Sequence, residues 1–315
     1  MPEKEPQFNR EMEGLEKWLH DVPVETVGTE KERQENLERF SEELKIERDG
    51  RGILEEEYRE RLERAKSFLE NLPLIHVTSF ASIERILDSG KVLSISEIKK
   101  NEEHPRGNTF PADQEAGFDK FVFAGLGNVV IGDAAVVFKE KILDRPDCFI
   151  TAEDVVDVPK RLLDAGFRWP TYDWKYLTKE KNPAFFAEVL KEYRKQTLAG
   201  KDFKRFLADF IATHCAKPEE YVGFSDSEVY KKAWSRFYHP FSSERQPLFP
   251  MAWHNPEIKV MKEIGIDDIR FIMVGNIETA ESLARYYKIP LDRFKVRRFI
   301  TIATMKELWE TCGYD

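Results

Sequence analysis

The stretch Leu74-Ile75-His76-Val77-Thr78-Ser79 runs directly into Phe80-Ala81-Ser82-Ile83-Glu84-Arg85-Ile86-Leu87-Asp88-Ser89-Gly90. The first part is a short apolar run that predicts a strand, and the second part places its apolar residues on one face of a helix. Gly90 follows where helices often end in a residue with positive φ. His76 and Thr78 are two residues apart, so a strand directs both side chains to one face. Such a polar pair is either satisfied inside the protein or directed into a cleft.

Further strand-like segments follow this opening in a recognisable order. They are Phe121-Val122-Phe123-Ala124-Gly125, residues 132–138, Asn255-Pro256-Glu257-Ile258-Lys259-Val260 and residues 269–274. Together with residues 74–90, these segments resemble the bacterial ADP-ribosyltransferases, most closely the DarT group. The resemblance implies an α+β fold built on a split, mixed and mainly antiparallel sheet.

The resemblance also implies that NAD is the co-substrate and that Glu257 is the catalytic residue. A carboxylate placed beside the anomeric carbon stabilises the positive charge that develops as nicotinamide leaves. His76 would bind the ribose hydroxyls, and Thr78 and Ser79 would shape the same pocket. The alternative for Glu257 is a solvated acid that begins a strand, and the alternative for His76 is a place in the core. Thr78 could equally be an ordinary β-branched strand residue.

Three more residues take roles from the same resemblance. Arg106 lies in a polar loop and would bind the pyrophosphate, which suits the guanidinium fork; its alternative is a solvated side chain. Phe123 would line the nicotinamide side of the pocket or be an ordinary core residue. Asn255 stands two residues before Glu257, where many protein-modifying transferases carry Gln or Glu. Its amide would orient the acceptor by hydrogen bonds, and the difference argues against an arginine-specific enzyme.

The charge distribution suggests two regions. Residues 1–72 hold 21 acidic and 13 basic residues of a chain whose net charge is −9. We predict an acidic helical extension over 1–72 and an ADP-ribosyltransferase-like domain over 73–315, with a helical insertion at about 151–247. The extension either caps the domain or binds a regulator such as an antitoxin.

Within the insertion, an amphipathic helix is expected to follow Asp202 as its N-cap. Its apolar positions recur at helical spacing, which favours a place in the core. These positions are Phe203, Phe206, Leu207, Phe210 and Ile211.

The three cysteines, Cys148, Cys215 and Cys312, show neither metal-ligand spacing nor a disulfide framework. We therefore expect a reducing compartment and no metal. The N-terminal residues have no signal-peptide layout, and no apolar run is long enough to span a bilayer. These observations favour a cytoplasmic protein without a membrane partner, although delivery by a secretion system leaves no mark that can be read here.

The expected activity is transfer of ADP-ribose from NAD to a macromolecule, either nucleic acid or protein. The resemblance suggests a toxin in a toxin–antitoxin, phage-defence or injected-effector setting. Residues 191–206 and 285–298 mix basic and aromatic residues, as nucleic-acid surfaces do, although ordinary helix faces have similar compositions. The alternatives are an NAD glycohydrolase, in which water is the acceptor, and an inactive scaffold that binds a partner through its acidic helices.

Overall fold

The computed structural model describes residues 19–101, 110–126, 129–130, 133–152, 158, 177–223, 256–297, 302–303 and 310–312. Within these residues, one eight-stranded sheet has the order β11-β10-β5-β1-β3-β8-β6-β7. Its strands are β1 (Leu74–Thr78), β3 (Phe121–Gly125), β5 (Ala134–Phe138), β6 (Cys148–Thr151), β7 (Thr197–Ala199), β8 (Glu257–Met261), β10 (Ile269–Val274) and β11 (Phe294–Val296). Only β10 and β11 pair in parallel in this sheet. The expected α+β class with a mostly antiparallel sheet is confirmed.

Two short two-stranded sheets accompany the main one. They are formed by β2 (Lys91–Leu93) with β9 (Glu263–Gly265), and by β4 (Val129–Val130) with β12 (Ile302–Ala303). The chain leaves β8 for β9 at Lys262, whose φ of 58° is a left-handed conformation that side chains rarely adopt. This turn carries the chain out of the main sheet towards β2.

The main sheet divides between β1 and β3. β1 pairs with β5 along all of its five residues, and β3 pairs with β8 along all of its five. In contrast, β1 and β3 share the single pair Ile75–Gly125. We call this junction the split, because the half-sheets β11-β10-β5-β1 and β3-β8-β6-β7 meet there at one point.

The local signals around β1 are confirmed. Helix α5 (Phe80–Ser89) begins directly after the strand, and the Ser79 hydroxyl accepts a hydrogen bond from the Ser82 amide at 3.2 Å as its N-cap. Gly90 ends the helix with φ of 71°, the left-handed conformation that glycine adopts without a steric penalty. The polypeptide therefore turns away from the sheet immediately beyond Thr78.

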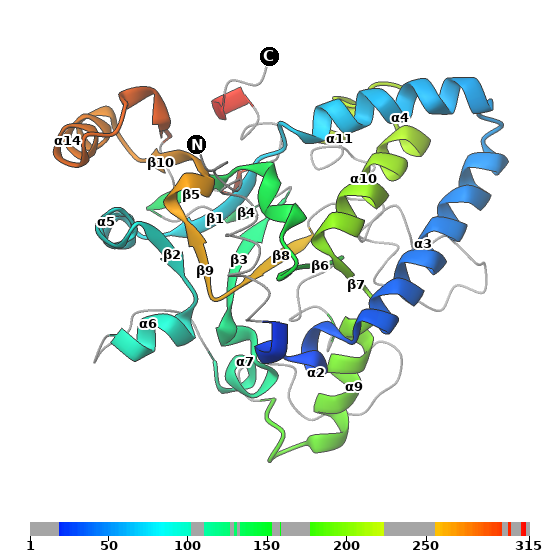
Figure 1. Ribbon diagram of the computed structural model, residues 1–315, viewed down its shortest axis with the longest axis horizontal. Coiled ribbons are helices and arrows are strands. Elements are labelled where there is room, and N and C mark those ends of the chain that lie inside the picture. The colour runs from blue at the N-terminus through cyan, green and yellow to red at the C-terminus, as the bar shows by residue number, and fades with distance from the viewer. Residues whose placement is uncertain are drawn as a thin grey trace, which may run out of the picture.

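Helices cover both faces of the sheet (Figure 1). One face carries α3 (Glu30–Gly50), α4 (Glu55–Leu69), α5, α10 (Gly200–His214) and α14 (Ile277–Tyr287), which share the main hydrophobic core with that face. The other face carries α2 (Val24–Val27), α7 (Pro111–Ala116) and α9 (Pro183–Arg194) over the half-sheet that contains β8. The sheet is thus the middle layer of three.

The remaining elements are short. They are α6 (Ile95–Asn101), α11 (Glu220–Gly223), η1 (Leu19–Asp21), η2 (Phe118–Lys120), η3 (Glu140–Asp144), η6 (Ile266–Asp268) and η7 (Leu291–Arg293). Among the described helices, none combines the length and the apolar character that crossing a bilayer requires.

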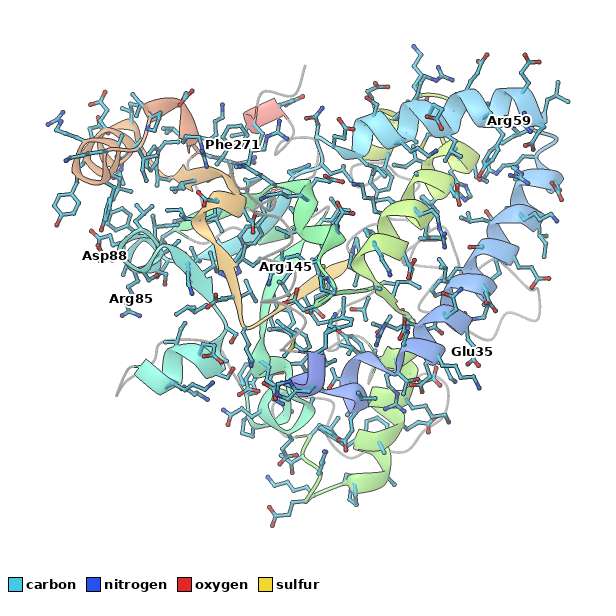
Figure 2. All side chains as sticks on the ribbon, viewed as in Figure 1. Glu35, Arg59, Arg85, Asp88, Arg145 and Phe271 are labelled. Carbon is cyan, nitrogen blue, oxygen red and sulfur yellow. The ribbon has the colours of Figure 1, made fainter. Side chains whose placement is uncertain are left out.

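The helices of residues 30–69 belong to the main core. Phe40 of α3 is 5% exposed and lies with its ring centroid 5.8 Å from that of Phe206 on α10. Outward-facing positions of the same helices are charged, as Glu35 on α3 and Arg59 on α4 illustrate (Figure 2). The charged residues of α3 and α4 therefore lie on the outer surface of these helices, while their inner surface is apolar.

Two details of the expected insertion differ in the structure. Ala199, and not Asp202, is the N-cap of α10; Asp202 lies in the first turn, where its charge favours the helix dipole. β7 also lies inside the region expected to be helical, because Thr197 pairs with Thr151 and extends the sheet by one strand. The apolar stripe of α10 is buried as expected.

We predict that Phe40→Ala lowers the free energy of unfolding by about 3–5 kcal/mol, since it leaves a cavity in the core. Ile46→Ala is the matched control, because Ile46 is on the same helix but 66% exposed and should cost less than about 0.5 kcal/mol. Urea unfolding of both variants measures the difference. Equal small effects would show that α3 is a detachable extension.

Candidate active site

Residues from four strands form one row across the second half-sheet and the split. Ile75 pairs with Gly125, Gly125 pairs with Glu257, and Glu257 pairs with Thr151. Directly paired residues direct their side chains to the same face of a sheet. Gly125 lies between Ile75 and Glu257 in this row and has no side chain. The strands β1 and β8, which carry these two residues, are about 10 Å apart, so that distance is not filled by a side chain of the row.

Glu257 begins β8 with its side chain 17% exposed. Its Oε2 atom accepts hydrogen bonds from the Tyr193 hydroxyl and, at 3.2 Å, from the Lys259 ammonium. Its Oε1 atom has no hydrogen-bond partner among the described residues. The carboxylate is therefore held by one oxygen while the other remains able to accept a hydrogen bond or face a positive charge.

Lys259 lies on the same face two residues further along β8, and its side chain is fully buried. Its ammonium donates to Thr151 Oγ1 at 2.6 Å, to Tyr193 Oη at 2.7 Å and to Glu257 Oε2. Thr151 in turn donates to Tyr193 Oη at 2.9 Å. We call these four residues the Glu257 network. It joins β8 to β6 and to helix α9.

His76 lies at the split itself. Its Nδ1 atom is 2.7 Å from the Phe123 carbonyl oxygen, so Nδ1 carries the proton and donates it. Burial lowers the pKa of His76 below its ordinary value of 6.5, and the Phe123 hydrogen bond opposes this only partly. The imidazole is therefore neutral at pH 7, and its Nε2 lone pair remains an acceptor.

The structure places His76 on β1 and Glu257 on β8, the two strands that flank β3, but their side chains lie on opposite faces of the sheet. His76 pairs with Val136, a residue of the main core, and its ring lies 6.3 Å from that of Phe138. Glu257 faces the opposite side. A ligand that touches both side chains must therefore pass through the split.

The other expected pocket residues occupy the same neighbourhood. Thr78 ends β1 on the face of His76 and is half-buried, while Ser79 is exposed and caps α5 with its hydroxyl. Phe123 is half-buried, pairs with Lys259 across the sheet, and packs against Phe118 at 6.2 Å between ring centroids. An aromatic ring therefore lies beside the Glu257 network.

Two predicted site residues, Arg106 and Asn255, lie outside the described residues. Within the described part of the chain, no group of three or more His, Cys, Asp or Glu side chains is arranged to hold a metal ion. The groups available for chemistry here are the carboxylate of Glu257, the imidazole of His76 and the cation of Lys259.

Sequence reasoning missed Lys259, Tyr193 and Thr151. A signal for Lys259 was present, because a lysine flanked by Ile258 and Val260 in an apolar strand, two residues from Glu257, must share that residue's face. Tyr193 had no comparable signal, since its contact with Glu257 spans 64 positions. Only the folded chain brings the two together.

The basic and aromatic stretch 191–206 does not offer rings for stacking on bases. Tyr193, Phe203 and Phe206 are all at most 1% exposed. In the other stretch, 285–298, Phe294 is also buried, whereas Tyr286 is 77% exposed. Of the two alternatives for residues 191–206, the structure favours an ordinary helix face, because these rings lie in the core.

Comparison with known proteins finds neither a family model nor a curated protein that matches this chain. The resemblance to ADP-ribosyltransferases therefore rests on the segments of residues 74–90, 121–138 and 255–274. It stays a prediction, which the geometry around the split makes testable.

We predict that the pH dependence of stability reports the half-buried, neutral His76. As the pH falls below about 6.5, the unfolded chain binds a proton at this residue before the folded chain does. The free energy of unfolding should therefore fall by up to about 1.4 kcal/mol per pH unit until the lowered pKa is reached. Urea unfolding of wild type and His76→Asn at about pH 7.5 and about pH 5.5 measures this change.

His76→Asn is the matched variant, because its amide can donate to the Phe123 carbonyl without titrating. It should lose less stability than wild type over the same interval. Equal losses in the two proteins would contradict a lowered pKa for His76.

Proposed function

We propose that this protein is an NAD-dependent ADP-ribosyltransferase that releases nicotinamide and transfers ADP-ribose to a macromolecule. The observation that carries the proposal is the position of Glu257. Its carboxylate is held by Oε2 next to the side-chain-free Gly125, two strands from His76 and beside the split. A fixed carboxylate in this place suits a reaction in which positive charge develops on a sugar.

The chemistry at Glu257 follows from charge. The bond between ribose C1′ and the nicotinamide nitrogen breaks, and its electron pair leaves with nicotinamide. The acceptor's nucleophilic atom then bonds to C1′ and loses its proton. Glu257 Oε1 stabilises the positive charge at C1′ between these events more strongly than it stabilises the substrate, which is the condition for a faster reaction. Carboxylates act on a similar charge in glycosidases.

His76 supports binding of the nicotinamide ribose. Its Nδ1 proton is committed to the Phe123 carbonyl, so Nε2 accepts a hydrogen bond from a ribose hydroxyl. A neutral imidazole also adds no second positive charge where the sugar becomes cationic. These two properties suit His76 to bind a ribose hydroxyl at the split.

The further binding roles follow the resemblance. The half-buried ring of Phe123 lines the nicotinamide side, and Thr78 and Ser79 form the end of the pocket where β1 meets α5. Arg106 binds the pyrophosphate and Asn255 orients the acceptor. No metal takes part in this scheme.

The acceptor is a nucleic acid or a protein, and the biological setting is a toxin of the toxin–antitoxin, phage-defence or injected-effector kind, acting in the cytoplasm. Such a toxin requires a regulator, and the helical regions offer a surface for one. The charged outer faces of α3 and α4 are available to an antitoxin, because their inner faces are in the core (Figure 2).

We predict that Glu257→Gln lowers nicotinamide release from NAD by about 100-fold or more, since it removes the charge that stabilises the cationic sugar. The assay measures nicotinamide release by the full chain in separate reactions with DNA, RNA or cell-lysate protein and labelled NAD. Glu263→Gln is the matched control, because Glu263 is on the neighbouring strand β9 and pairs with Lys91 at 2.8 Å.

The outcomes separate three readings of the site. Label in one acceptor class, abolished by Glu257→Gln but not by Glu263→Gln, supports the transferase and identifies its target. Nicotinamide release without label in any macromolecule assigns the same site to an NAD glycohydrolase. Absence of release by folded wild-type protein with every acceptor would contradict both enzymes and leave the binding scaffold.

A further inference from the structure

In the Glu257 network, the donor and the acceptor of each hydrogen bond between side chains can be assigned. Lys259 can only donate, and its ammonium donates to Thr151, Tyr193 and Glu257. The Tyr193 oxygen accepts from Lys259 and from Thr151, which occupies both of its lone pairs. Its hydroxyl proton therefore goes to Glu257 Oε2. The hydrogen bonds from Tyr193 and Lys259 thus converge on one carboxylate oxygen of Glu257, and Lys259 additionally donates to the Glu257 backbone carbonyl at 3.4 Å.

We infer that Lys259 and Tyr193 are positioning residues that hold Glu257 by Oε2 and present Oε1 to the ligand. The inference rests on the proposed function for its catalytic meaning, while the positioning itself concerns this chain alone. A carboxylate at the start of a strand has several accessible rotamers. Two donors on one oxygen, from different elements, select one of them and reduce the reorganisation needed during the reaction.

The cost of burying Lys259 supports this role. Moving an ammonium out of water is expensive even when it is paired, and apolar residues of similar volume commonly serve packing equally well. Lys259 is completely buried on its face of β8, where its cross-strand partners are Phe123 and Phe149. A methionine at this position would fill the space, but it would give Glu257 and Tyr193 no donor.

Tyr193 is itself held from outside the sheet. It lies at the end of α9, directly before a turn whose carbonyls are bound by helix α3. Asn36 donates to the carbonyls of Arg194 at 2.8 Å and Thr197 at 3.0 Å, and Arg39 donates to that of Lys195. The turn therefore cannot shift without breaking contacts to α3, so the Tyr193 hydroxyl reaches Glu257 from a fixed support.

The test uses Tyr193→Phe and Lys259→Met in the full chain. Their matched controls are Tyr221→Phe, a buried tyrosine on α11, and Lys262→Met, a lysine whose ion pair is with Asp21. Tyr193→Phe removes a single oxygen atom and is expected to fold. The inference can therefore still be tested if Lys259→Met does not fold. The first readout is the side-chain carboxyl ¹³C resonance of Glu257 in protein labelled with ¹³C-glutamate, identified by its loss in Glu257→Gln.

We predict that Tyr193→Phe and Lys259→Met each move the Glu257 resonance, whereas the two controls leave it in place. This readout does not require NAD. A resonance that stays in place in both variants would show that the contacts do not hold the carboxylate, and the inference would be overturned whatever the turnover of NAD.

The second readout is kinetic and separates positioning from a merely structural role. Tyr193→Phe should lower kcat for nicotinamide release by about 10- to 100-fold with little change in KM, because a misplaced carboxylate fails in the transition state. If Tyr193→Phe lowers the stability but leaves kcat of the folded protein unchanged, the network has only a structural role and the inference is overturned.

If the wild-type protein releases no nicotinamide, the proposed function is refuted. The Glu257 carboxyl resonance then still shows whether Tyr193 and Lys259 position the carboxylate.

Discussion

The structure around the candidate site depends on the single backbone pair that joins β1 to β3. Beyond Ile75 and Gly125 the two strands separate, and the Phe123 carbonyl is left without a strand partner from β1. The His76 side chain supplies the missing donor. An unpaired carbonyl in this position would lower the stability of the fold. The hydrogen bond from His76 therefore offsets the free-energy cost of separating the two strands. The same ring therefore stabilises the split with one nitrogen, and its second nitrogen is the one to which the proposed function gives the ribose.

Electrostatics gives the two sides of the split different characters. His76 is kept neutral because burial lowers its pKa. On the other side, Lys259 and Glu257 form a charge pair in which the cation is buried and the anion is partly exposed. Such a pair is poor evidence for stability, because desolvation offsets most of the attraction. Its value is geometric, since it holds one identified oxygen of Glu257, Oε2, against Lys259 and Tyr193.

The parts of the fold that could be predicted from sequence are those set by local chemistry. Ser79 and Gly90 cap α5 as their residue types suggest, and the apolar spacing of α10 marks its buried face. Nonlocal features escaped prediction. Asp202 has the chemistry of an N-cap, yet α10 begins at Gly200 because β7 leads directly into it. From its basic sequence neighbours, Tyr193 would be predicted to lie on the surface. In the fold its hydroxyl instead donates a hydrogen bond to Glu257, which is 64 positions away in the sequence.

The acidic N-terminal region shows why composition alone is a poor guide to domain structure. Its charge alone does not distinguish a cap on the domain from a surface for a regulator, because a helix needs only one apolar face to enter a core. Phe40 and Phe68 supply such faces, and α3 additionally binds the turn that follows Tyr193. A partner on the outer surface of α3 would therefore act on a helix that is joined to the Glu257 network by hydrogen bonds. Removing this helix instead would expose the core and release Tyr193 together, so loss of activity in a truncated chain would not show that the region regulates the site.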